Sequence, residues 1–360
     1  GDRMRDAVSN SGRIQASGGT ILLQADAAAH VFDSLVNNSG VIEAQSLENQ
    51  GGVVRLHGGT QVDYKGLGWE SNLRNSADAS GEVILTGAID VSAMEAGAAS
   101  GTVVLSGEYV GVSGSIAARG ASDTDGGKVL ISSTVGTVMT RAASVDVSGD
   151  SSIGATGGDI VGTGGVSNAG EVVIWSDSTT TFFATVLGRG GAAGGNGADV
   201  EVSGYARLAY GGRIDLGAAI GNAGTLLLDP LLVMLNTDVG DGDDADNTLD
   251  AVLSQLGADA DPITILEGDP VAGAPNGDGG EPFEIRVSEF ESVVAGTIIL
   301  QGAQGISDNP TGGDAIVNLL PGVNLVLEVT GNGGPGSIVL DVISIVGTGT
   351  IQILGDTAST

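Results

Sequence analysis

The residues best suited to chemistry are the aspartates of an acidic stretch at positions 236–247. Carboxylate oxygens are preferred ligands of Ca²⁺, so a cluster of them predicts a candidate calcium site. The stretch does not follow the EF-hand pattern, because no glutamate stands at the twelfth position of a suitable frame. The alternative interpretation is a solvated loop that leaves the body of the protein. The candidate ligands are Asp238, Asp241, Asp243, Asp244 and Asp246.

The same stretch raises a second kind of chemistry, the cleavage of polysaccharides by paired carboxylates. Asn236-Thr237-Asp238 followed by Asp243-Asp244 has a superficial likeness to pectin-hydrolysing β-helix enzymes. We expect no such activity, because the two acidic groups lie in one loop rather than on successive coils. The basic partners of those enzymes are also missing, since Arg286 is the only basic residue after Arg213.

Other reactive residues give weaker signals. The only histidines are His30 and His57, and two scattered histidines do not predict a Ser-His-Asp site. We expect a surface or turn role for His57. The glycine-rich stretch 190–197 lacks the Lys-Ser/Thr of a phosphate-binding loop, so we expect a turn there.

The aromatic side chains form at most a shallow platform for stacking on a sugar, and we expect them instead in core or end-of-coil packing. Aromatics make up only 3% of the chain, so Val, Ile, Leu and Ala must build the core. Most of the aromatics are Tyr64, Trp69, Trp175, Phe182, Phe183, Tyr205 and Tyr210.

Composition excludes several classes of protein. The 360 residues include no cysteine, which rules out disulfides and thiol catalysis and is compatible with export as an unfolded chain. The net charge of −31 has the wrong sign for nucleic-acid binding and fits a soluble extracellular protein kept apart by self-repulsion. No apolar run reaches the length of a membrane-spanning helix, so we expect no membrane insertion. Gly1-Asp2-Arg3-Met4 is typical of a start inside a larger precursor, and we expect a fragment or processed product.

The elements that must position these residues are short strands with glycine at their corners. A phrase of glycine, any residue and an apolar run recurs along the chain, as at Gly81–Leu85 and, twenty residues later, Gly101–Leu105. A unit of this kind cannot bury its apolar face alone, so the repetition predicts a stacked solenoid. A second phrase at 9–16 matches 37–44, and a third alternates apolar and polar residues, as in 145–148.

These phrases predict an all-β fold in which each strand bonds to the coil above and the coil below, about 4.8 Å away. A coil of about 20 residues would give roughly 16 to 18 coils and a rod on the order of 80 Å long. The one helix expected covers 247–256, with Thr248 as its cap and Gly257 as its end. Residues 350–355 read as a strand with no polar cap, so we expect the rod to continue beyond Thr360 in more chain or in another subunit.

Three features of the sequence stand out together: Asn38-Ser39-Gly40-x-Ile42-x-Ala44, the passage from Val172 through Gly197, and above all Gly224-Thr225-Leu226-Leu227-Leu228-Asp229-Pro230. They resemble the filamentous haemagglutinin family, the large exoproteins of two-partner secretion. The likeness covers roughly residues 8–235 and is weaker through Gly305. The family's amino-terminal Asn-Pro-Asn-Gly-type motifs are missing, so we expect a segment that follows the secretion domain or a divergent member.

The resemblance implies a right-handed parallel β-helix with short turns and one insertion containing the acidic loop and short helix. The expected divisions are coils at 1–235, the insertion at 236–295 and further coils at 296–360. It also implies secretion through an outer-membrane two-partner secretion transporter and non-catalytic adhesion at the surface of a Gram-negative cell, with a host or neighbouring-cell glycan or protein as receptor. The first alternative is a structural subunit of an extracellular filament joined end to end through open coils. The second is a polysaccharide-acting β-helix enzyme.

Overall fold

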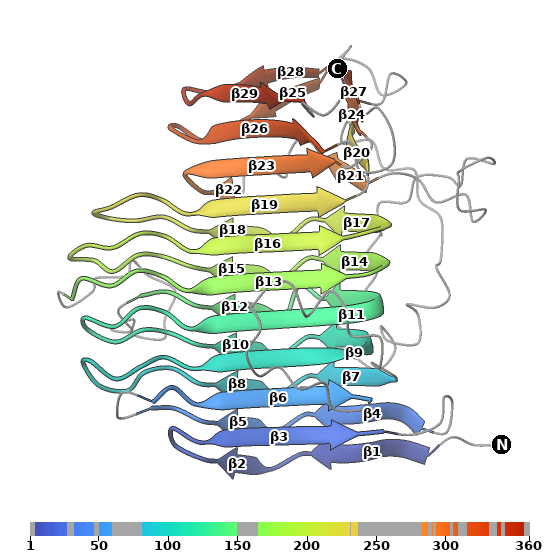
Figure 1. The fold of residues 1–360 in the computed structure, drawn as a ribbon, viewed down its shortest axis with the longest axis vertical. Helices are drawn as coiled ribbons and strands as arrows, with labels where there is room; N and C mark the ends of the chain where they lie inside the picture. Colours follow the sequence, from blue (N-terminus) through green and yellow to red (C-terminus); the bar gives the residue numbers. More distant parts are fainter. Residues whose placement is uncertain are drawn as a thin grey trace.

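The computed structural model describes a chain made of stacked parallel strands (Figure 1). Within the described residues the protein is all-β, with no α-helix. The helix predicted at 247–256 lies outside them. The described residues are 4–26, 32–46, 50–59, 81–149, 165–230, 232–236, 283–286, 290, 293–302, 305–308, 315–330, 337–339 and 343–355.

One side of the stack is a row of strands that we call row A. Each strand of row A pairs in parallel and in register with the next one along the chain, and Figure 1 shows them as successive rungs. Row A contains β3 (Thr20–Ala25), β6 (Val53–Gly58), the first half of β9 (Thr102–Val112), the first half of β11 (Lys128–Met139), β13 (Glu171–Ser176), β16 (Asp199–Gly204), β19 (Thr225–Pro230), β23 (Thr297–Gly302), β26 (Asn324–Val329) and β29 (Ile351–Leu354).

A second row, row B, shares two long strands with row A. β9 and β11 run from row A into row B, and the register between them shifts between Ser133 and Gly136, at the corner. Row B also contains β1 (Met4–Asn10), β4 (Phe32–Asn38), β7 (Glu82–Leu85), β14 (Thr179–Phe182), β17 (Arg207–Tyr210), β21 (Phe283–Arg286), β20 (Leu232–Asn236), β24 (Gly305–Asp308) and β27 (Ser337–Val339).

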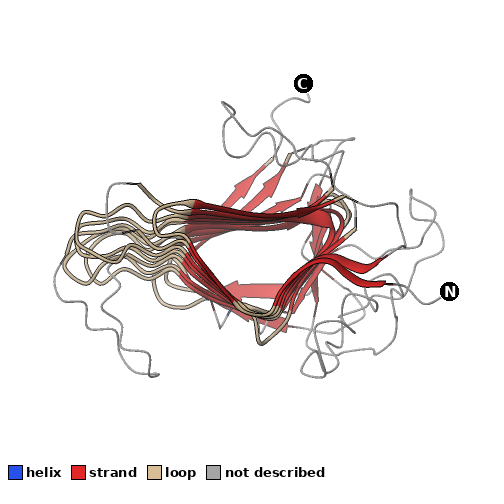
Figure 2. Ribbon diagram, turned by 90° about the horizontal axis from the view of Figure 1, so that it is seen from below, coloured by secondary structure: helices blue, strands red, loops and turns tan. Residues whose placement is uncertain are grey.

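A third row, row C, consists of short strands that pair in parallel. Seen along the stack, strands of successive layers superpose and the rows lie on different sides (Figure 2). A separate pair is formed by β25 (Ala315–Asn318) and β28 (Ile343–Val346). Row C contains β2 (Arg13–Gln15), β5 (Val41–Glu43), β8 (Ala88–Asp90), β10 (Ser115–Ala117), β12 (Ser144–Asp146), β15 (Thr185–Leu187), β18 (Arg213–Asp215) and β22 (Val293–Val294).

The repeat is longer than the sequence predicts. Thr102 pairs with Lys128 and Glu171 with Asp199, so the residue number rises by 26 to 28 from one uninterrupted layer to the next. The expected period of about 20 residues is wrong, because it is the distance between two phrases that lie in different rows. Glu82, in the first phrase, pairs with Tyr109 in row B, whereas Thr102, in the second phrase, begins the row A half of β9. Row A holds ten described strands, which at about 4.8 Å per step span roughly 43 Å, about half the expected length.

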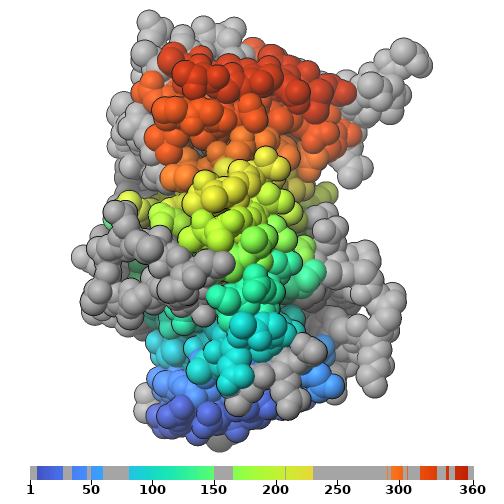
Figure 3. Space-filling model, turned by 90° about the vertical axis from the view of Figure 1, so that its left-hand side faces the viewer, coloured from blue at the N-terminus to red at the C-terminus, as the bar shows by residue number. Residues whose placement is uncertain are grey.

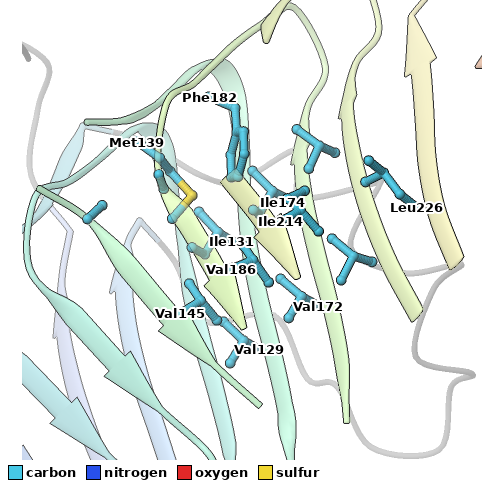
Figure 4. Close-up of a cluster of buried hydrophobic side chains, with 14 of the residues drawn as sticks. Val129, Ile131, Met139, Val145, Val172, Ile174, Phe182, Val186, Ile214 and Leu226 are labelled. Atoms are coloured by element: carbon cyan, nitrogen blue, oxygen red, sulfur yellow. The ribbon is translucent and has the colours of Figure 1, made fainter. Parts of the chain in front are cut away.

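Apolar columns run through the interior along the stack. In row A two columns are aliphatic at every described level, and Figure 4 shows part of this core. Burial of this surface, at about 25 cal/mol per Å², is the main stabilising term. The first column is Ile21, Val54, Val103, Val129, Val172, Val200, Leu226, Ile298, Leu325 and Ile351, and the second is Leu23, Leu56, Leu105, Ile131, Ile174, Val202, Leu228, Leu300, Leu327 and Ile353.

Row C carries an equivalent column, which faces the same core. Its members from β2 to β22 are all Ile or Val, and all except Ile14 are buried. They are Ile14, Ile42, Ile89, Ile116, Val145, Val186, Ile214 and Val293.

Glycine is required where the turns enter row A. A Cβ on Gly127 would lie 2.1 Å from the carbonyl oxygen of Gly101, and one on Gly170 would lie 1.8 Å from that of Gly127. These glycines lie one above the other, each just before a row A strand. The recurring glycine of the sequence phrase therefore allows close approach between layers.

The strands on either side of the predicted insertion pair directly. Thr225 of β19 pairs with Thr297 of β23, although the whole insertion lies between them in the sequence. Within that interval β21 pairs with β17 and β20, and β22 pairs with β18. The division at 235 and 295 stays a prediction.

Candidate functional site

The acidic loop falls outside the described residues, so its five aspartates have no described geometry. Asn236 is the last described residue before it and ends β20 in row B. The calcium site therefore stays a prediction. Among the residues that the structure describes, no group of three or more His, Asp or Glu side chains is placed to hold a metal ion. The predicted ligands concerned are Asp238, Asp241, Asp243, Asp244 and Asp246.

His57 is buried, which corrects the expected surface or turn role. It is the fifth residue of β6, only 5% exposed, and it pairs with Ser106 of the next layer. Its Nδ1 lies 2.6 Å from Ser106 Oγ. Sequence spacing could not show this pair, because the two partners are 49 positions apart. His30 lies outside the described residues.

The described aromatic side chains mostly pack, as expected. Phe182 and Tyr210 stack in the interior with ring centroids 5.4 Å apart and an interplanar angle of 15°. Trp175 is 7% exposed, and its Nε1 donates a 2.8 Å hydrogen bond to Asp177. Tyr205 is the exception at 55% exposed. One exposed ring offers no stacking platform across layers, while Tyr64 and Trp69 lie outside the described residues.

The turns that lead from row C to row A form a stack of their own, here called the turn stack. They project from the body beside the rows (Figure 2) and include residues 91–101, 118–127, 165–170, 188–198 and 216–224. Backbone hydrogen bonds link successive turns, for example from Gly190 N–H to Gly217 O at 3.0 Å. The glycine-rich stretch 190–197 is part of this stack, and it forms a turn before β16 as predicted.

An amide ladder runs along the outer part of the turn stack. The side-chain oxygen of each member accepts a hydrogen bond from the backbone N–H of the member in the next layer. Asp125 Oδ1 accepts from Asn168 N at 2.7 Å, Asn168 Oδ1 from Asn196 N at 2.9 Å, and Asn196 Oδ1 from Asn222 N at 3.0 Å. These bonds fix the spacing between turns on the exposed side of the protein.

A charged ladder follows the ends of the row C strands. Acidic residues at the last strand position, such as Asp146 and Asp215, contact basic residues one layer away. Arg189 Nε donates a 2.7 Å hydrogen bond to Asp215, and Arg119 lies 3.9 Å from Asp146. Asp146 and Asp215 also accept bonds from backbone N–H groups two residues on, at 3.0 and 3.1 Å. These carboxylates therefore hold the turns and the arginine side chains in place.

Exposed apolar side chains lie in two places of interest. Met94, Val166 and Ile220 belong to the turn stack and are 52%, 62% and 61% exposed. Ile351 and Ile353 belong to β29 and are 44% and 64% exposed. Both sets are large apolar side chains open to solvent.

Comparison with known proteins adds no assignment. No protein-family model, no curated protein and no solved structure matches this chain. Within the described part of the chain, no helix has the length and apolarity needed to span a membrane.

Proposed function

We propose that the chain is a segment of a secreted haemagglutinin-like adhesin, folded as a right-handed parallel β-helix that acts as a stiff rod. The observation that carries the proposal is the pair of aliphatic columns in row A, which continue without a polar interruption through ten in-register parallel strands. Stacking of this kind gives an elongated and rigid body whose outer surface repeats along its axis.

The export route forms part of the proposal. A chain without cysteine and with a net charge of −31 is suited to crossing an outer membrane unfolded and to remaining dispersed outside the cell. We place it at the surface of a Gram-negative cell, exported through a two-partner secretion transporter. The resemblance in the segment 224–230 supports this assignment.

The turn stack is the proposed contact face for a glycan or protein on another cell. Its layers are fixed by the amide ladder, and its exposed Met94, Val166 and Ile220 recur along the axis. Weak contacts that repeat along one rod add through multivalency. No step of this mechanism requires catalysis or a cofactor; the acidic loop at 238–246 remains a proposed Ca²⁺ site.

Binding of the fluorescently labelled chain to cultured epithelial cells tests the proposal. We expect saturable binding, reduced at least fivefold by Val166→Asp combined with Ile220→Asp. Leu22→Asp is the matched control, because Leu22 is 42% exposed but lies in row A rather than in the turn stack. Wild-type binding no greater than that of an unrelated protein of equal acidity would refute the proposal.

A further inference from the structure

We infer that the turn 216–224 binds a glycine-rich peptide segment of a partner protein on its upper side, the side that faces the β23 layer. Backbone hydrogen bonds to this segment would add one more level to the turn stack. The inference rests on the turn stack proposed above as a contact face, and it names the partner for one end of that face. It starts from a change between two described layers, those of β19 and β23.

The turn stack stops at this level although the strands continue. Residues 216–224 lead from β18 to β19, whereas Ala295 and Gly296 alone lead from β22 to β23. Backbone bonds of 2.7 and 2.8 Å tie the two ends of the turn to the β23 layer, but its middle, residues 219–222, is exposed. In Figure 1 the turn before β19 projects beyond the chain that enters β23, and Figure 3 looks onto this side of the protein.

One backbone N–H group loses its partner at the level of this turn. In each turn the third residue after the row C strand has an N–H group that points to the turn above. At four successive levels this group donates to a carbonyl oxygen of the next turn, at 2.9 to 3.0 Å. Ala218 holds the position in the turn 216–224, and its N–H has no partner among the described residues. The four bonds run from Ala93 to Arg119, Gly120 to Ser148, Gly149 to Arg189 and Gly190 to Gly217.

The amide ladder breaks off at the same level. In three lower turns the residue after the ladder residue donates its N–H to the carbonyl oxygen of the next ladder residue, at 2.8 to 2.9 Å. Ala223 holds this position in the turn 216–224. Within the described part of the chain, neither its N–H nor the Oδ1 of Asn222 has a hydrogen-bond partner. The three lower bonds run from Gly126 to Asn168, Ala169 to Asn196 and Gly197 to Asn222.

Two donors and one acceptor are therefore held in the pattern that receives another turn. At every lower level of this series the chain's own next turn occupies the corresponding place, so the molecule shows what fits there. Unpaired backbone groups at the edge of a stack are templates for another polypeptide. A partner segment would accept from Ala218 and Ala223 through two carbonyl oxygens and donate one N–H to Asn222.

Close approach between turns restricts the side chains of this segment. A Cβ on Gly221 would lie 2.2 Å from the carbonyl oxygen of Gly195 in the turn below, and one on Gly197 would lie 1.9 Å from that of Leu216 in the turn above. A segment that approaches to the same distance needs glycine at its contact positions. Residues 216–224 carry no charged side chain, so an uncharged segment matches them.

Two apolar side chains border the uncovered part of the turn. Ile220 is 61% exposed, and Val294 of the layer above is 38% exposed. Val294 lies next to the turn, because a Cβ on Gly217 would be 3.5 Å from its Cγ1. Small aliphatic side chains of the segment would pack against both residues, at about 25 cal/mol per Å² of apolar surface covered.

Nuclear magnetic resonance of protein labelled with ¹⁵N-alanine tests the site. The probe is a capped, uncharged peptide with the sequence of residues 216–224, Leu-Gly-Ala-Ala-Ile-Gly-Asn-Ala-Gly. The amide signals of Ala218 and Ala223 should shift downfield, with a Kd on the order of 0.1–1 mM because a short peptide loses entropy when it becomes ordered. Ala93 and Ala169 hold the equivalent positions in lower turns and should not respond, since their N–H groups are already bonded. No shift at about 5 mM peptide, or equal shifts of all four signals, would overturn the inference.

A second peptide tests the requirement for glycine. It carries alanine at the position of Gly221 and should bind at least tenfold more weakly. Added NaCl should leave the affinity of the first peptide unchanged, because the turn is uncharged, and this separates the site from general attraction to an acidic protein. Equal binding of the two peptides would contradict the inference. A shift of the same signals with the neutral oligosaccharide maltoheptaose, and not with the peptide, would refute a peptide as the occupant.

Two asparagine variants separate binding from stability. Asn222→Ala removes the open acceptor and should weaken peptide binding at least threefold without lowering the melting temperature. Asn168→Ala removes an acceptor that already holds the N–H of Asn196 at 2.9 Å, so it should lower the melting temperature and leave the affinity unchanged. Equal effects of the two variants on binding would refute the site. No cells enter these measurements, so their failure would leave adhesion to be decided by the separate cell-binding test.

Discussion

Ile174→Ala and Ile353→Ala make the same chemical change at two levels of one column. Ile174 is fully buried between Ile131 and Val202, while Ile353 is 64% exposed. Removing a buried isoleucine side chain to alanine costs about 2–5 kcal/mol, through lost burial and the cavity that remains. At Ile353 only about a third of the side chain is covered, so we expect a loss of less than about 1 kcal/mol.

Urea unfolding followed by far-ultraviolet circular dichroism measures both values. In each variant the free energy of unfolding must fall with urea concentration at the wild-type slope. A changed slope would signal loss of cooperative unfolding in a repeat protein rather than a local effect of the substitution. The measurement is made at protein concentrations where the chain is monomeric. Equal losses for the two variants, or a larger loss at Ile353, would refute the assignment of this column to the interior.

Three further outcomes follow from the geometry. In urea titrations Gly127→Ala should lower the free energy of unfolding by about 1–3 kcal/mol, because the added Cβ would lie 2.1 Å from a carbonyl oxygen. The control Gly12→Ala, whose Cβ would have no atom closer than 3.9 Å, should change this free energy by less than about 0.5 kcal/mol. Arg189→Ala removes a partly exposed pair with Asp215 and should cost less than about 1 kcal/mol, a loss that shrinks at an NaCl concentration of about 1 M. If the aspartates at 238–246 bind Ca²⁺, calorimetry should give saturable heat and Ca²⁺ should raise the melting temperature; no heat and no stabilisation would remove the site.

The row A strands were predictable because one glycine phrase marks them. Gly19, Gly52, Gly127, Gly224 and Gly296 each stand directly before the first residue of a row A strand. The phrase encodes two requirements at once, close approach of layers at the corner and an apolar inward position two residues later. Both requirements are local, so the sequence displays them.

The layer length was not predictable from the phrase alone. Gly81-Glu82-Val83-Ile84-Leu85 has the composition of a row A strand, yet β7 lies in row B and pairs with the second half of β9. The two rows bury similar aliphatic faces, so composition does not distinguish them. Counting this copy as a row A strand made the apparent period too short, because the true partner of Thr102 in the next layer is Lys128.

The polar contacts between layers were also hidden. Asn196 and Asn222 are 26 positions apart, Asp125 and Asn168 are 43 apart, and His57 and Ser106 are 49 apart. Insertions of different length change the spacing from one layer to the next. These residues can be recognised as partners only when the register of the strands is known, so the sequence alone gave no sign of the contacts.

The register of successive layers is tested most directly by disulfide formation, since the natural chain contains no cysteine. Thr102→Cys with Lys128→Cys places thiols at paired positions of neighbouring strands, where the Cα separation of about 4.8 Å lies within disulfide range. Thr102→Cys with Ser122→Cys tests the shorter period that the sequence phrases predict. Mild oxidation should link 102 to 128 within one molecule and leave the 102 and 122 pair reduced. A crosslink between 102 and 122 without one between 102 and 128 would contradict the stacked arrangement.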